Sequence, residues 1–91
     1  MDMIYTEERR RYVIASLDNP TLFVKVLGGK KYTLMDSVVS ATKYAERSLA
    51  NEMIGYYRDA TGDMRDLVVI PVLITYDMID ETTYKLDGGF K

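Results

Sequence analysis

Carboxylate side chains form the densest group of residues in this chain that could do chemistry. Three lie at or just after the end of an expected helix, and three lie near the end of the strand that follows it: Asp59, Asp63, Asp66, Asp77, Asp80 and Glu81. Carboxylate oxygens are the ligands that Mg²⁺ and Ca²⁺ prefer. The first three are separated by three and then two residues, whereas a calcium-binding loop places its ligands at every second position. We therefore predict no metal site at these residues.

Two explanations of these carboxylates need no metal. Solvated surface charge is the ordinary state of acidic side chains in loops, and an acidic patch that binds a partner protein is the functional alternative. The two groups need not meet, because one lies at each end of a strand roughly 30 Å long. If the chain has a partner-binding site, these six residues are our candidates for it.

Catalysis finds little support in the residue types. None of the 91 residues is histidine or cysteine. Histidine is the commonest general base and metal ligand, and cysteine supplies the thiolate nucleophile. Mechanisms built on Ser-His-Asp or Cys-His are therefore excluded. We predict that the chain has no catalytic residues, no enzymatic activity and no cofactor.

A basic triplet gives the opposite kind of candidate. Arg9, Arg10 and Arg11 could contact phosphate, and eight tyrosines could offer stacking faces for bases. The formal net charge of the chain is −2, and Glu7 and Glu8 adjoin the triplet. Such a balance opposes a general electrostatic attraction to nucleic acid. A small nucleic-acid-binding accessory protein therefore remains an alternative to a protein-binding one.

The elements that must position these residues are easiest to see at 67–76. This run contains one polar side chain, Thr75. A strand that is apolar on both faces belongs in a sheet covered on both sides or in a subunit interface. Pro71 lacks a backbone N–H and should interrupt the ladder. We therefore predict a buried strand with a bulge or a sheet edge at Pro71.

Four further segments complete the expected fold. Residues 11–16, 22–27 and 31–35 have the composition of strands, and Gly28-Gly29 suits a tight hairpin turn. Residues 45–60 carry apolar side chains at helical spacing, and Gly62 suits the end of that helix. Residues 36–41 could form one helical turn, and residues 1–8 are expected to form a loose arm. The fold class predicted is α+β: a small antiparallel sheet with one main helix packed on it, in the order β-β-β-α-β.

We expect residues 1–91 to form one domain, with a core at about 11–80 and frayed termini. One face of the last strand should be buried against the helix: Val68, Ile70, Val72 and Ile74 with Leu49 and Met53. A single helix covers only one face of a sheet, so the other face of that strand needs a second cover. The arm and the C-terminal tail are short and polar, which favours a homodimer. Pro71 favours packing face to face over extension of the sheet.

Several runs of the chain resemble small, mostly uncharacterised proteins encoded by phages and prophages of Gram-positive bacteria. The runs are YVIAS, LFVKV, ATKYAERSLANEMI and VVIPVLITYDMI, over residues 11–80. In those proteins a meander leads through an A-T-K-[FY] segment, here residues 41–44, into one helix and then a V-x-P-V strand, here residues 69–72. The resemblance implies a non-enzymatic accessory protein that binds a host protein. Inhibitors of host defence nucleases, including anti-CRISPR proteins, are one such group.

Our hypothesis from the sequence is therefore a phage-encoded inhibitor of a host nucleic-acid-processing nuclease. RNA-guided nucleases hold nucleic acid in positively charged channels, which a small acidic protein could block. A structural or assembly subunit with residues 67–76 at an interface is a further alternative. No apolar run approaches the roughly 20 residues of a membrane span, and the charged N-terminal segment lacks the apolar core of a signal peptide. We expect a protein of the bacterial cytoplasm.

Overall fold

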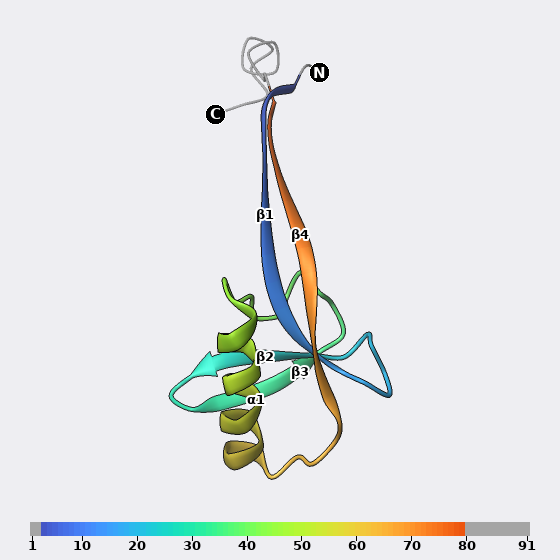
Figure 1. The fold of residues 1–91 in the computed structure, drawn as a ribbon, viewed down its shortest axis with the longest axis vertical. Helices are drawn as coiled ribbons and strands as arrows, with labels where there is room; N and C mark the ends of the chain where they lie inside the picture. The colour runs from blue at the N-terminus through green and yellow to red at the C-terminus, as the bar shows by residue number, and fades with distance from the viewer. Residues whose placement is uncertain (1–2, 80–91) are drawn as a thin grey trace, which may run out of the picture.

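The computed structural model describes residues 3–79, which form a four-stranded antiparallel sheet and one helix. In chain order the elements are β1 (Met3–Ser16), β2 (Phe23–Gly28), β3 (Lys31–Met35), α1 (Arg47–Thr61) and β4 (Leu67–Ile79). The strands lie in the order β3-β2-β1-β4, and α1 packs against the sheet (Figure 1). The predicted α+β class and element order are confirmed.

Local turn chemistry explains the β2–β3 hairpin. Gly28 and Gly29 have φ of 92° and 57°, values that are open to glycine and unfavourable for other residues. Lys30 follows with φ of 62°, and the register shifts between Val26 and Gly28. The predicted hairpin and the bounds of β3 are confirmed. β2 begins and ends one residue later than expected, and the turn therefore lies at Gly29-Lys30 and not at Gly28-Gly29.

Helix α1 begins two residues later than expected and ends one residue later. At its C-terminus Gly62 adopts a left-handed conformation, and its N–H donates to the Arg58 carbonyl at 2.8 Å. At its N-terminus no side chain caps the helix. The Arg47 guanidinium, which the helix dipole disfavours there, lies 5.0 Å from the ring centre of Tyr12. This contact ties the start of the helix to β1.

The core forms between α1 and one face of the sheet. Its buried members come from every element except β3 and include one residue before the helix: Ile14, Val24, Tyr44, Ala50, Tyr57 and Val69. Tyr32 of β3 meets Tyr57 edge to face, with ring centres 5.6 Å apart. Met53 packs against this cluster as predicted.

The face of β4 that meets the helix was predicted wrongly. Ile14 lies opposite Val69, and directly opposite residues share a face, so Leu67 and Val69 face α1. Val68 and Ile70 therefore lie on the opposite face. Leu49, also predicted to be buried, is 43% exposed. The buried face of the helix is centred one residue later in the sequence, on Ala50 and Tyr57.

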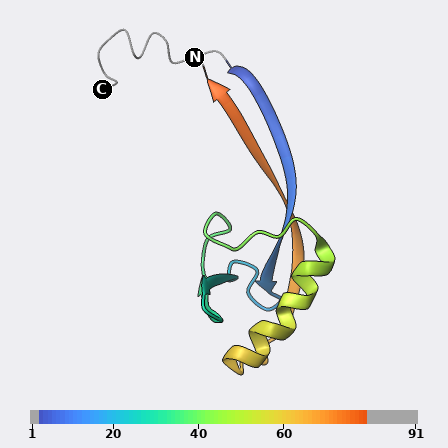
Figure 2. The same cartoon turned by 90° about the vertical axis from the view of Figure 1, so that its left-hand side faces the viewer.

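The face away from the helix is covered by a segment that the sequence did not identify as a cover. Val13 and Ala15 lie on this face and are fully buried. Lys25, on the same face of β2, donates from Nζ to the Ser40 carbonyl at 3.2 Å. Residues 36–43 thus lie on this side of the sheet, opposite the helix (Figure 2). Ser37 Oγ accepts from the Val39 N–H, which caps the single turn expected there.

Strands β1 and β4 continue beyond the core as a two-stranded ribbon (Figure 1). The two are paired without a break from Tyr5–Met78 to Ser16–Leu67. The molecule measures 54 Å along its longest axis and 24 and 23 Å across. Residues 3–8, expected to be part of a loose arm, are therefore strand, because β4 offers them a partner of equal length. The predicted fraying of 80–91 lies outside the described residues.

Pro71 lies at a sheet edge and does not interrupt the ladder. Its opposite residue, Tyr12, exchanges both backbone hydrogen bonds with Tyr44 at 2.8 Å, on the side away from β4. In an antiparallel pair, opposite residues either both bond each other or both point outward. The position where Pro71 lacks an N–H therefore faces the outer edge of β4. The edge alternative is right, and the expected interruption of the ladder is wrong.

Candidate functional site

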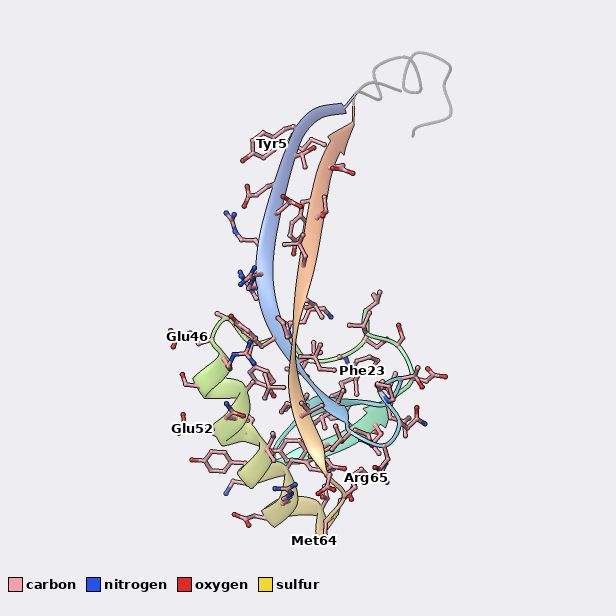
Figure 3. The ribbon with its side chains drawn as sticks, turned by 45° about the vertical axis from the view of Figure 1, so that its right-hand side comes forward. Tyr5, Phe23, Glu46, Glu52, Met64 and Arg65 are labelled. Atoms are coloured by element: carbon pink, nitrogen blue, oxygen red, sulfur yellow. The ribbon has the colours of Figure 1, made fainter. Side chains whose placement is uncertain are left out.

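The ribbon of residues 5–11 and 72–78 presents one face rich in aromatic and apolar side chains. We call it the tyrosine face, and the pairing of β1 with β4 defines its members: Tyr5, Glu7, Arg9, Arg11, Val72, Ile74, Tyr76 and Met78. Tyr5, Tyr76 and Met78 are 51%, 56% and 57% exposed. Tyr5 lies near the far end of the ribbon, remote from the helix (Figure 3). No other described element packs over these three side chains.

Charged groups hold the tyrosine face in a defined arrangement. The Tyr5 hydroxyl donates to Glu7 Oε1 at 2.9 Å, and Glu7 forms an ion pair with Arg9. An open groove of about 430 Å³ runs between these residues and Arg11, Tyr76 and Met78. Tyrosine, methionine and arginine are the residue types enriched at the centres of protein interfaces. The face therefore has the chemistry of a protein-binding surface.

The opposite face of the ribbon is more polar. Thr6, Glu8, Arg10, Leu73, Thr75 and Asp77 lie on it, as the strand pairing requires. Thr6 Oγ1 donates to Asp77 Oδ1 at 3.1 Å. Strand alternation thus places Arg10 on one face and Arg9 and Arg11 on the other. The basic triplet does not form one cluster, and the carboxylates of Glu7, Glu8 and Asp77 on the same ribbon balance its charge.

The four candidate carboxylates that lie within the described residues do not form one patch. Asp59 belongs to the last turn of α1, and Asp63 and Asp66 lie in the loop that leads to β4. Asp77 lies on the ribbon about ten strand residues further along, roughly 33 Å away. Met64 and Arg65 mark the lower group in Figure 3, at the end of the molecule opposite Tyr5. Asp80 and Glu81 lie outside the described residues.

Asp63 is occupied by contacts within the chain. Its carboxylate accepts from the Tyr57 hydroxyl at 2.6 Å and from the Arg65 backbone N–H at 3.0 Å. The Arg65 guanidinium lies 2.9 Å from Asp63 Oδ2. The Tyr57 hydrogen bond, more than any single contact with Arg65, lowers the pKa of Asp63. These contacts join the helix end to the loop before β4, which gives this carboxylate a structural role.

Two smaller hollows lie on the body. One, of about 350 Å³, is lined by Lys30, Tyr32, Tyr56, Asp59 and Ala60. The other, of about 300 Å³, lies between the turn at residues 38–43 and residues 72–75 of β4. Lys43 closes that turn by donating from Nζ to the carbonyls of Val38, Val39 and Ala41.

A buried hydroxyl is the remaining polar group of interest. The Tyr44 hydroxyl is buried without a hydrogen-bond partner in the part of the chain described. Burial, with a smaller effect from Tyr32, raises the pKa of Tyr44. The hydroxyl therefore stays protonated at neutral pH and is a poor general base.

Within residues 3–79 no three histidine, cysteine, aspartate or glutamate side chains are grouped so that they could hold a metal ion. The helix in this range is too short and too polar to cross a membrane.

Sequence reasoning missed the tyrosine face. The signal that could have revealed it is the length of the last strand, β4. A strand of 13 residues needs a partner of similar length. The alternation of Tyr5, Glu7, Arg9 and Arg11 also has the period of a strand. The polar composition of residues 6–11 concealed this, because it offers no apolar face by itself.

Comparison with known proteins gives no assignment. No protein-family model matches the chain, and neither a curated protein nor a solved structure matches it.

Proposed function

We propose that this chain is a non-enzymatic protein-binding module that engages its partner through the tyrosine face of the ribbon. The observation that carries this proposal is the exposure of Tyr5, Tyr76 and Met78 on a strand pair that projects from the core. A two-stranded ribbon is only marginally stable in water by itself. Large apolar side chains at the free end of such a ribbon add little to folding and are available to a partner.

The tyrosine face combines the features expected of a binding hot spot. Tyrosine and arginine are the residues most often found there, and they act best around a concave site from which water is excluded. The open groove beside Arg9 and Arg11 gives this face a shallow concavity, from which a bound partner would exclude water. The Tyr5–Glu7–Arg9 contacts restrict side-chain motion before binding, which lowers the entropy lost on association.

Binding to nucleic acid is the weaker alternative. A two-stranded ribbon can enter the major groove of DNA, and three arginines lie on this one. Their charge is balanced on the ribbon by Glu7, Glu8 and Asp77. Salt-dependent affinity for DNA needs cations that are free to replace counterions at phosphates. The balance of charge therefore favours a protein partner.

The narrower hypothesis names a host defence nuclease as the partner and rests on the resemblance to phage proteins. The acidic residues support it less than expected, because Asp59, Asp63 and Asp66 near the helix end lie far from Asp77 on the ribbon. In this proposal the tyrosine face, and not an acidic patch, would contact the partner. An assembly role would use the same face.

The proposal is tested with two paired tyrosine variants. Tyr5→Ser with Tyr76→Ser removes two aromatic rings from the tyrosine face, and Tyr56→Ser removes a ring of similar exposure, 58%, from the helix. Each variant and the parent chain are immobilised and exposed to lysate of a Gram-positive bacterium. We expect a partner that the parent and Tyr56→Ser retain and the double variant loses.

Two results would contradict the proposal. One is equal retention of the partner by the double variant. The other is binding of duplex DNA by the isolated chain at sub-micromolar concentration and physiological salt, with a steep loss of affinity as salt is raised. A cleavage assay with the captured partner then tests inhibition of a nuclease separately.

A further inference from the structure

At Glu8 and Arg10 no described strand pairs with the outer edge of β1. Because Tyr12 directs its backbone groups away from β4, strand alternation directs those of Glu8 and Arg10 to the same outer edge. The side chains of Arg9 and Arg11 donate to the Glu8 and Arg10 carbonyls, at 3.2 and 2.8 Å. Between residues 7 and 11 no described strand pairs with this edge. An additional strand could therefore bind there once two flexible side chains turn aside.

The outer edge of β4 is a poorer template. Pro71 faces that edge and supplies no N–H to a neighbouring strand. Tyr44 pairs with Tyr12 and so occupies the outer edge of β1 at that residue. Pro71 lies opposite Tyr12, so the outer edges of β1 and β4 are both interrupted at this pair of residues. Along the ribbon itself, only the edge of β1 combines open backbone groups with a row of charged side chains.

The charges along this edge are self-complementary. The run from Glu7 to Arg11 reads acidic, acidic, basic, basic, basic. When two such runs pair antiparallel about Arg9, Glu8 lies opposite Arg10 and Glu7 lies opposite Arg11 of the other copy. Opposite charges at facing positions stabilise an antiparallel pair, and like charges destabilise it.

Other registers are less favourable. The outward-facing residues must meet one another, so the symmetry axis passes through a residue and not between two. An axis at Glu8 would place two glutamates face to face, and an axis at Arg10 would oppose only arginines at the centre. With the axis at Arg9, the single like-charged pair is Arg9 with itself, and each Arg9 is already neutralised by its own Glu7.

We propose that two copies of this chain associate through the outer edge of β1, antiparallel and with the two-fold axis at Arg9. The result is a four-stranded ribbon in the order β4-β1-β1-β4. Tyr44 of each copy limits the shared ladder to residues 7–11, so the dimer is weak and sensitive to salt. The pairing leaves the tyrosine face uncovered, and it does not depend on the function proposed above.

Disulfide trapping tests the register directly, because the chain has no cysteine of its own. Arg9 would oppose itself at a position without backbone hydrogen bonds, where Cα atoms are about 4.5 Å apart. This distance suits a disulfide. We expect Arg9→Cys to form a covalent dimer on mild oxidation, while Thr75→Cys, on the outer edge of β4, stays monomeric. Failure of Arg9→Cys to cross-link, or equal cross-linking of both variants, would overturn the proposal.

Charge reversal supplies the second test. One variant carries Glu7→Arg and Glu8→Arg, and the other carries Arg10→Glu and Arg11→Glu. Each alone would oppose like charges, and its dimer dissociation constant should rise roughly tenfold or more in sedimentation equilibrium. An equimolar mixture restores every opposite-charge pair and should associate about as tightly as the parent chain.

The mixture also separates misfolding from a changed interface, since two misfolded variants would not recover on mixing. A mixture no tighter than either variant alone would refute the charge pairing. Loss of the partner protein in the tyrosine experiment, with cross-linking through Arg9→Cys intact, would leave this inference standing.

Discussion

Replacing Tyr57 by phenylalanine should destabilise the fold by about 1.5 kcal/mol while Asp63 is ionised, and by less once Asp63 is protonated. The Tyr57 side chain is 3% exposed, and its hydroxyl donates to Asp63 Oδ2 at 2.6 Å. Hydrogen bonds to charged groups contribute about 1.5–3 kcal/mol. We expect the lower end of this range, because both Arg65 donors still satisfy the carboxylate after the substitution.

The pH dependence follows from the two pKa values. The hydrogen bond lowers the pKa of Asp63 below its ordinary value of 3.8. The contact therefore stabilises the fold fully above about pH 4 and is lost as the pH falls through the folded-state pKa. Burial, and secondly the bond to Asp63, raises the pKa of Tyr57 above 10.0. The stabilisation of the fold that follows from this raised pKa is present below pH 10 and is lost as the pH rises through the folded-state pKa of Tyr57.

The assay is urea unfolding of three chains at neutral pH and again in acid well below pH 3.8, where the Asp63 carboxyl is protonated in the folded chain as well. Tyr56→Phe is the matched control, since Tyr56 is the adjacent residue and is 58% exposed. With an m-value of about 1 kcal/mol/M for a small protein, Tyr57→Phe should lower the midpoint by about 1.5 M at neutral pH. The control should change it by less than about 0.5 M, within the range typical of surface substitutions. Equal effects of the two substitutions, or a Tyr57→Phe effect that persists undiminished in acid, would refute the reasoning.

The remaining predictions concern the helix. Gly62→Ala should lower the free energy of unfolding by about 1 kcal/mol because φ at residue 62 is 72°. Gly55→Ala should raise it by up to about 1 kcal/mol because the added Cβ meets no atom within 4 Å. The two substitutions should shift the thermal midpoint in opposite directions, and shifts of the same sign would contradict the assigned helix end. Met53→Asp should unfold the domain by placing an unpaired carboxylate against the core, while Leu49→Asp should be tolerated because Leu49 is 43% exposed. Circular dichroism distinguishes these two, and a folded Met53→Asp chain would show that the helix face is misassigned.

Elements whose geometry depends on a few neighbouring residues could be predicted from the sequence alone. The glycine pair before β3 predicts positive φ, Gly62 predicts the helix end, and the apolar spacing between them predicts one helix. In each case the physical cause lies within a few residues along the chain. The same is true of Pro71, whose missing N–H restricts β4 to an edge or a bulge.

Features that depend on contacts between distant residues could not be predicted in this way. An apolar run on both faces of β4 does not indicate which face meets the helix, and pairing with β1 decides this by placing Val69 beside Ile14. Residues 5–10 have no apolar face and form a strand because β4 provides backbone partners for them.

The same pairing placed the candidate residues of the ribbon. Strand alternation divides the three arginines between two faces, and the length of β4 separates Asp77 from the carboxylates near the helix end. The sequence alone determined which side chains were present and which local elements would carry them. Only the tertiary structure determined which side chains would meet, because register and facing are set by hydrogen bonds between residues more than fifty positions apart in the chain.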